Sequence, residues 1–125
     1  MPIITFPAAT KLNISVKKLI NDTDQQVAAL KIIKEECNPL AILGFMDLSV
    51  EAECFGAEIK VTDNEVPTVV GQLIEDEDDA QALKVPAVGS GRSQLYIDAI
   101  KKLKQKLKIS LFWEVVLVRL VWLVV

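Results

Sequence analysis

The chain has 125 residues, which suits one domain or part of a larger one, and 51% of them are hydrophobic, which indicates a folded chain. Its formal net charge of −3 argues against a general affinity for nucleic acids. The sequence contains no histidine, so the commonest metal ligand and the commonest general base are both missing.

The first half of the sequence predicts helices followed by one buried strand. Ser15 is a candidate cap for a short helix, and Thr23 with Gln26 forms a capping-box pattern that opens a helix to about Cys37. The stretch LAILGFM, Leu40–Met46, is a continuous apolar run of strand length. Such a run is typical of a strand covered on both faces, as in a parallel sheet.

The second half predicts a helix, an excursion and a longer helix. Ser49 and Gly56 are suited to begin and end a helix directly after the strand. The segments AEIKVTD and PTVVGQL read as paired strands, or as a strand and a loop, and the acidic run Glu75–Asp79 leads into a short helix. An apolar stripe from Leu95 to Leu107 predicts an amphipathic helix. This order indicates an α/β fold with parallel strands, in which the next strand would follow that helix.

The two cysteines, Cys37 and Cys54, lie outside any CxxC arrangement. Their spacing favours reduced, buried thiols over a disulfide or a metal site, and it suits a reducing cytosol. The N-terminal MPIITFPAAT lacks the basic region and long apolar run of a signal peptide. We therefore predict a cytoplasmic protein.

Asp47 is the one candidate for site chemistry that the residues themselves suggest. It comes just after the apolar strand, and the start of a helix follows it directly. Ligands of α/β sheets and barrels bind at that end of the strands, where a carboxylate can accept a substrate N–H or act as a base. The alternative is that Asp47 only caps the next helix. The loop VGSGR, Val88–Arg92, matches none of the established phosphate-loop motifs.

A family resemblance runs through this part of the chain. It is carried by the strand ending in Asp47, then SVEAECFGAEI, the VP of Val66 and Pro67, and an acidic segment running into VPAVGSGR before an amphipathic helix. The pattern resembles the uroporphyrinogen decarboxylase superfamily, and within it the branch of cobamide-dependent methyltransferases. The likeness covers residues 1–108.

The resemblance implies an α/β fold in which this chain is the N-terminal part of an incomplete (β/α)8 TIM barrel, since whole barrels need about 200 to 400 residues. It also implies that Asp47 is a substrate contact, because the matching aspartate of the decarboxylases binds pyrrole N–H groups. The decarboxylases carry an arginine-bearing segment near the N-terminus, whereas TFPAATKLNIS here has none. Methyl transfer is therefore preferred, and porphyrinogen decarboxylation stays as an alternative.

For a full-length methyltransferase relative, the resemblance implies a corrinoid methyl donor and a zinc ion, held by His and Cys residues, that activates a thiol. Those ligands lie in the later part of the barrel, and Cys37 and Cys54 do not match them. We therefore assign this chain no metal or cofactor of its own. The implied partners are a small-molecule or corrinoid-protein substrate, with no nucleic acid and no membrane.

The last stretch, KISLFWEVVLVRLVWLVV, is unlike the rest of the chain. It is too short for a membrane-spanning helix, and it contains Glu114 and Arg119. Residues 112–125 can be written in one permitted set of codons. When one base is inserted near Phe112, the same codons translate into a stretch containing Gly-Pro-Phe-Ser-Leu, an element that the family shows after this helix. We therefore interpret residues 1–108 as the barrel portion and residues 109–125 as a hydrophobic, frameshifted tail.

Two hypotheses of function follow. In the first, the chain is a truncated product of a gene for corrinoid-dependent methyl transfer and is inactive by itself. In the second, it is a small non-enzymatic α/β protein that self-associates through its apolar tail. A variant ending at Lys108 separates them, because a stable monomer favours an independent module and aggregation favours a barrel portion with an uncovered sheet edge.

Overall fold

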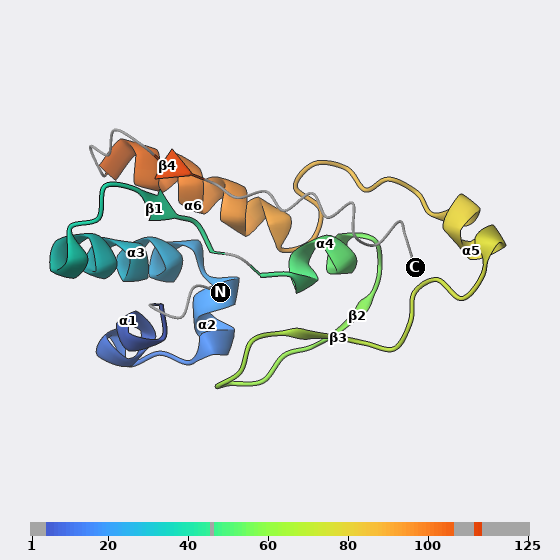
Figure 1. Cartoon of the computed structure of the whole chain (residues 1–125), viewed down its shortest axis with the longest axis horizontal. Helices are drawn as coiled ribbons and strands as arrows, with labels where there is room; N and C mark the ends of the chain where they lie inside the picture. Colours follow the sequence, from blue (N-terminus) through green and yellow to red (C-terminus); the bar gives the residue numbers. More distant parts are fainter. Residues whose placement is uncertain (1–4, 46, 107–111, 114–125) are drawn as a thin grey trace.

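The computed structural model describes residues 5–45, 47–106 and 112–113, which place a group of helices beside a pair of parallel strands (Figure 1). In chain order this part holds three helices, a strand, a helix, a two-stranded hairpin, two further helices and a strand. Among the described helices, none is long and apolar enough to cross a membrane.

The first three helices are α1 (Thr5–Leu12), α2 (Val16–Asn21) and α3 (Thr23–Cys37). Helix α3 is the central one, because α1 and α2 pack against it on one side and α6 (Ser93–Lys106) packs against it on the other (Figure 1). The predicted helix ending at about Cys37 is confirmed, whereas α1 was not among the predicted helices.

Side-chain caps set the starts of α2 and α3. The hydroxyl of Ser15 accepts a hydrogen bond from the backbone N–H of Lys18, as predicted, and satisfies a donor in the first turn of α2. The carboxylate of Asp22 accepts from two N–H groups in the first turn of α3. Helix α3 ends at Asn38, which takes a left-handed conformation with φ 41°.

The strand and helix that frame the candidate site are β1 (Ile42–Leu43) and α4 (Ser49–Cys54). Gly56 follows α4 with φ 97°, a conformation that suits glycine, and confirms the predicted end of the helix. The strand β4 (Phe112–Trp113) pairs with β1 in parallel, with Ile42 opposite Phe112. The strand expected after the last helix is therefore present, and it lies beside the first strand.

Between α4 and α6 the chain makes the predicted excursion. The strands β2 (Glu58–Lys60) and β3 (Thr68–Val70) form an antiparallel hairpin, in which Ile59 lies opposite Val69. The short helix α5 (Glu77–Ala82) follows the hairpin and has no buried residue. The predictions of paired strands and of a short helix after the acidic run are both confirmed.

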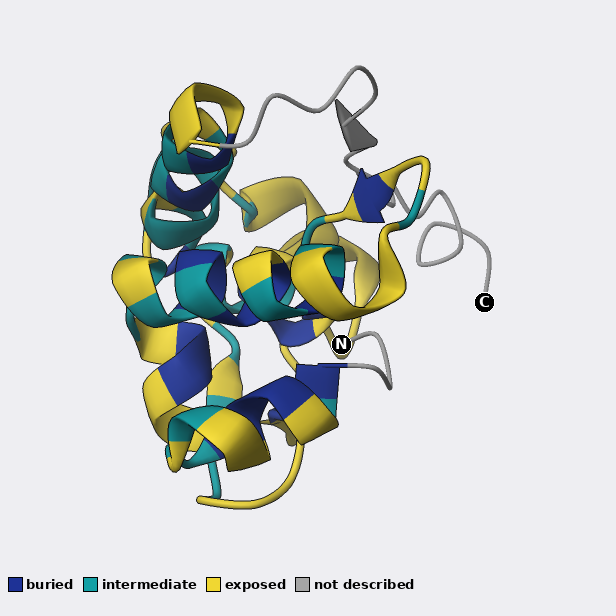
Figure 2. Ribbon diagram, turned by 90° about the vertical axis from the view of Figure 1, so that its left-hand side faces the viewer, coloured by how far each residue is buried: buried dark blue, intermediate teal, exposed yellow. Residues whose placement is uncertain are grey.

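The hydrophobic core lies on both sides of α3, where α1 and α2 face it on one side and α6 on the other, with one residue of β1 against it. Figure 2 shows the buried residues on these facing sides and the exposed residues on the outer sides. Each fully buried leucine or isoleucine contributes on the order of 1.5–3 kcal/mol by leaving water. The members of the core are Ala8, Ala9, Leu19, Val27, Ala29, Leu30, Ile33, Ile42, Ala99 and Leu103.

Two predictions about local structure are wrong in part. The apolar run Leu40–Met46 was expected to be one buried strand, but β1 holds only two residues, and Leu40 is 96% exposed. The reason is that β1 pairs along two residues only, and its burial alternates between Ile42 inside and Leu43 outside. Met46 lies outside the described residues.

The capping box at Thr23 is also wrong by one position. Thr23 is the first helical residue, and its hydroxyl donates to the backbone carbonyl of Leu95 in α6. Gln26 is fully buried, and its amide donates to the carbonyl of Ile20. Asp22 takes the capping role because a carboxylate before the helix can accept the free N–H groups of its first turn.

Candidate functional site

Asp47 lies between β1 and α4 as the sequence predicted, but β1 ends at Leu43, so Asp47 does not follow the strand directly. Its residue is buried, and 1% of its side chain is exposed. Ser49 was expected to cap α4, but it is the first residue of the helix, and Leu48 stands at the cap position without a side-chain bond. The side chain of Ser49 is turned toward Asp47 instead.

One carboxylate oxygen of Asp47 is held by Ser49 alone. The oxygen Oδ1 accepts the backbone N–H of Ser49 at 3.0 Å and its hydroxyl at 2.5 Å. The N–H bond has the geometry of a residue that caps a helix start, so the alternative that Asp47 only caps α4 accounts for one of the four bonds to its carboxylate. The backbone carbonyl of Asp47 also accepts the N–H of Val50 at 3.2 Å.

The other carboxylate oxygen belongs to a buried ion pair with Arg92. The Nη1 of Arg92 lies 2.6 Å from Asp47 Oδ2, its Nε lies 2.6 Å from Glu53 Oε2, and its Nη2 donates to the hydroxyl of Ser49 at 3.0 Å. The side chain of Arg92 is 9% exposed. Burial works against the charged guanidinium, but the bonds and charges of Asp47 and Glu53 outweigh it, so the pKa of Arg92 is raised.

Tyr96, in the first turns of α6, supplies the last contact to Asp47. Its hydroxyl donates to Asp47 Oδ2 at 3.2 Å, the longest of the four side-chain and backbone bonds to this carboxylate. Burial of the hydroxyl, and then the negative charge of Asp47, raise the pKa of Tyr96 well above its usual range. Tyr96 therefore remains a neutral donor throughout the physiological pH range.

The carboxylate of Asp47 is thus fixed in one orientation. An ionised carboxylate has about four acceptor directions, and here two donors from Ser49, one from Arg92 and one from Tyr96 occupy them. A substrate N–H or O–H would have to share or replace one of these bonds. A substrate would replace the Tyr96 bond most easily, because this bond is the longest and its donor carries no charge.

A small cavity lies next to this site, between α3 and α6. Its volume is about 10 Å³, enough for about one water molecule and far too small for a corrinoid ring. Its lining includes Gly44 and Phe45 after β1, and Tyr96 of α6. This cavity therefore cannot hold a large cofactor.

A zinc site of the kind that the resemblance implies for longer relatives does not fit the described residues either. The sequence has no histidine, and residues 5–45, 47–106 and 112–113 contain no group of three acidic or cysteine side chains that could hold a metal ion. Cys37 is exposed, so the prediction that both thiols are buried is wrong for it. Cys54 is half-buried, and its thiol donates to the carbonyl of Ser90.

Sequence reasoning found Asp47 but missed its partners. The sequence places Arg92 at the end of a loop, Val88–Arg92, that matches no phosphate-loop motif, and no pattern singles out Tyr96. One signal could have found Arg92: it is the only arginine between the tail and the N-terminus, and it directly precedes a helix that must pack near the end of β1. Nothing in the spacing of Tyr96 pointed to Asp47.

Comparison with known proteins gives the family of this chain. The family model of uroporphyrinogen decarboxylase (URO-D) matches residues 4–112. The chain belongs to the uroporphyrinogen decarboxylase family. The match begins before α1 and ends at the first residue of β4, so it includes the whole Asp47–Arg92 site.

Two methyltransferases are similar to this URO-D family chain. It is 36% identical over 61 residues to the methylcobamide:CoM methyltransferase MtbA of Methanosarcina acetivorans. The aligned stretch covers 48% of this chain and 18% of that protein. A solved methyltransferase from Methanosarcina mazei matches with a TM-score of 0.73 and 19% identity, over 86% of this chain and 33% of its own. The fold is thus the N-terminal part of a TIM barrel, and the chain spans about a third or less of the relatives it matches.

Proposed function

We propose that this chain supplies the first part of a methyltransferase barrel that takes a methyl group from a corrinoid donor, and that it is inactive without the rest of the barrel. The support for methyl transfer is the likeness to a protein named as a methylcobamide:CoM methyltransferase. A small molecule or a corrinoid protein is the corresponding substrate, and we assign no zinc ligand to this chain, because the resemblance places those ligands in the later part of the barrel.

The observation that carries the proposal is the buried Asp47 site just beyond the carboxyl end of β1. Substrates of α/β barrels bind at this end of the strands. A carboxylate buried beside a paired arginine and a neutral tyrosine hydroxyl is more elaborate than a helix cap requires. We propose Asp47 as the substrate contact of the complete barrel, with Tyr96 as the donor that a substrate N–H or O–H displaces.

Decarboxylation of a porphyrinogen is the less favoured activity. Its substrate carries several carboxylates, which need cationic partners. The segment where the decarboxylases carry an arginine forms α1 and the turn after it, and Lys11, its one cation, is paired with Glu36. The buried cation of the site, Arg92, is already held by Asp47 and Glu53.

The test is complementation with the rest of a barrel. The full chain is co-expressed with the M. acetivorans methyltransferase from which the region matching this chain has been deleted. We expect the two pieces to co-purify and to transfer the methyl group of methylcobalamin to coenzyme M, followed by the change in corrinoid absorbance. Each piece alone should be inactive, because the substrate site needs both parts of the barrel.

Two variants of this chain make the test specific. Asp47→Asn should lower the restored rate at least about tenfold, because an amide presents N–H groups either to Ser49 or to Arg92, which are both donors. Asp78→Asn, on the exposed α5, removes the same charge far from the site and should leave the rate unchanged. Association without methyl transfer, or equal rates for both variants, would contradict the proposal. Release of CO₂ from uroporphyrinogen would instead favour the decarboxylase.

We also propose that the tail, residues 109–125, leaves the reading frame of the family by a one-base shift near Phe112. The support is that the family match ends at residue 112, next to the position where the shifted frame yields Gly-Pro-Phe-Ser-Leu. Apart from Phe112 and Trp113, this tail lies outside the described residues. Sequencing the gene across the codons for residues 110–113, beside the same region of related genes, tests the proposal. A related gene that encodes the same apolar tail in an intact frame would overturn it.

A further inference from the structure

Arg92 joins two segments that are far apart in the sequence. Its Nε, Nη1 and Nη2 each donate to a different side chain of the segment Asp47–Glu53. The residues between them, 55–91, form the hairpin, α5 and the loop before α6, and we call them the excursion. Arg92 therefore binds the chain that follows the excursion to the segment that precedes it.

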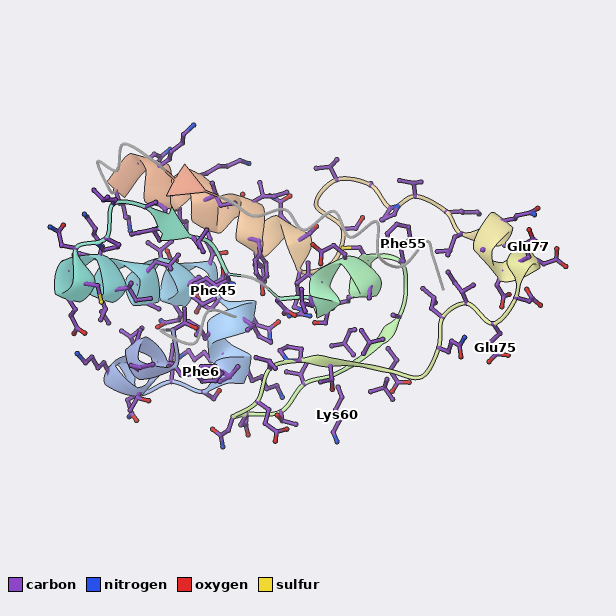
Figure 3. All side chains as sticks on the ribbon, viewed as in Figure 1. Phe6, Phe45, Phe55, Lys60, Glu75 and Glu77 are labelled. Carbon is purple, nitrogen blue, oxygen red and sulfur yellow. The ribbon has the colours of Figure 1, made fainter. Side chains whose placement is uncertain are left out.

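The two ends of the excursion are held together at this point. The thiol of Cys54 donates to the carbonyl of Ser90 at 3.1 Å, and a Cβ placed on Gly91 would lie 3.8 Å from the same sulfur. The far end is different, because residues 68–82 are all exposed. Figure 3 shows Glu75 and Glu77 at that far end, away from α3 and α6. The excursion is thus an arm with a closed base and an exposed far end, whose hairpin is also tied to α2, because the N–H of Val16 donates to the carbonyl of Asp63 at 2.8 Å.

The chemistry at this base requires an arginine. A guanidinium presents its N–H groups in a planar fork, which lets one side chain donate to Asp47, Glu53 and Ser49 together. A lysine carries the same charge on a single atom and cannot keep the three bonds in these directions. Because the side chains of Arg92 and Asp47 are buried, the guanidinium cannot leave Asp47 without leaving a buried charge unpaired, whereas 31% of the Glu53 side chain is exposed.

We propose that Arg92 is the positioning residue of this site. Arg92 fixes the carboxylate of Asp47 only while it is also bonded to Glu53, which holds the base of the excursion closed. Movement of the arm away from α4 would pull Arg92 from both carboxylates and free Asp47 Oδ2. The consequence for turnover rests on the proposed function, whereas the coupling of Glu53, Arg92 and Asp47 does not.

The first experiment uses the full chain and needs no activity. The backbone N–H of Ser49 donates to Asp47 Oδ1, so its hydrogen-exchange rate reports the orientation of that carboxylate. We expect Arg92→Lys and Glu53→Gln to accelerate exchange of the Ser49 amide about tenfold or more, because charge-assisted bonds are lost. Glu51→Gln is the matched control, since it removes the same charge from the exposed face of the same helix.

Amides of α3 and the activity of the complemented barrel distinguish the outcomes. Exchange at Leu30, in the core, should stay within about twofold of the unchanged chain, which separates local release of Asp47 from global unfolding. In the complemented barrel, Glu53→Gln should lower kcat more than it raises KM, although Glu53 does not touch Asp47. Unchanged exchange at Ser49 in both variants would overturn the proposal. Altered exchange with no methyl transfer by any variant would leave the positioning role standing and contradict the proposed function.

Discussion

Tyr96 makes the candidate site measurable, because it is the only tyrosine in the chain. Its pKa is raised in the folded state by burial and by the charge of Asp47, whereas an unfolded chain titrates at about 10. The folded state therefore keeps the proton where the unfolded state has lost it. The resulting stability is fully present below about pH 10 and is lost as the pH rises further.

We predict that tyrosinate absorbance appears only together with alkaline unfolding, at a pH above about 10. The measurement is an ultraviolet titration run beside circular dichroism, with a titration in guanidinium chloride as the control for the unfolded pKa. The free energy of unfolding of Tyr96→Phe should fall less steeply with alkaline pH, because this variant has no phenolic proton to lose. Free ionisation of Tyr96 near its ordinary pKa in a chain that is still folded would show that its hydroxyl does not donate to Asp47.

At the same scale, the sequence could predict the position of Asp47 but not its bonds. A short apolar strand followed by a carboxylate is a local pattern, and the structure places Asp47 accordingly. The contact with Arg92 depends on how the excursion returns to α4 after 55–91, which no local pattern encodes. The bonds from Ser49 to Asp47 join residues two positions apart, whereas the bond that the Ser49 hydroxyl accepts from Arg92 depends on that long-range return.

At the scale of single elements, the start of α3 is capped by Asp22 and not by Thr23, which the sequence pattern predicts. We predict that Asp22→Ala lowers the free energy of unfolding by about 1 kcal/mol, because two N–H groups of the first turn lose their acceptor. Asp22→Asn should retain most of the stability, since asparagine is an equally good cap. Urea unfolding measures both. If Asp22→Ala left the free energy of unfolding unchanged, Asp22 would not be the cap, and Thr23 would remain the candidate.

The two leucines Leu103 and Leu40 test which apolar stretches form the core. Leu103 of α6 is 1% exposed, whereas Leu40 is almost fully exposed. We predict that Leu103→Ala costs about 2–5 kcal/mol of unfolding free energy, from lost burial and the cavity left behind. The same change at Leu40 should stay within about 0.5 kcal/mol. Comparable losses at both positions would mean that Leu40 is covered, as the longer predicted strand required.

At the scale of the whole molecule, periodicity explains why the helices were easier to predict than the sheet. The stripe that includes Ala99 and Leu103 identifies α6 because a helix shows its buried face locally. The apolar run around Ile42 suggested a strand covered on both faces, yet how much of it pairs depends on β4, far away in the sequence. The family resemblance supplied the barrel that neither pattern could give.

The open sheet leads to a prediction about association. In the described residues β1 pairs with β4 alone, whereas barrel strands normally have a neighbour on each side. An unpaired edge beside exposed apolar residues attracts another chain. We therefore predict that the full chain self-associates in a concentration-dependent manner in analytical ultracentrifugation. Co-expression with the rest of the barrel should suppress this association, because the missing strands then cover the edges.

A variant ending at Lys108 decides what drives that association. It lacks β4 and the apolar tail but keeps α1 to α6. If the open edge of β1 is responsible, this variant should still aggregate and should lose stability relative to the full chain, as thermal unfolding would measure. If it is instead a stable monomer, residues 1–108 form an independent module, the tail alone causes the association, and the proposal of an incomplete barrel loses its basis.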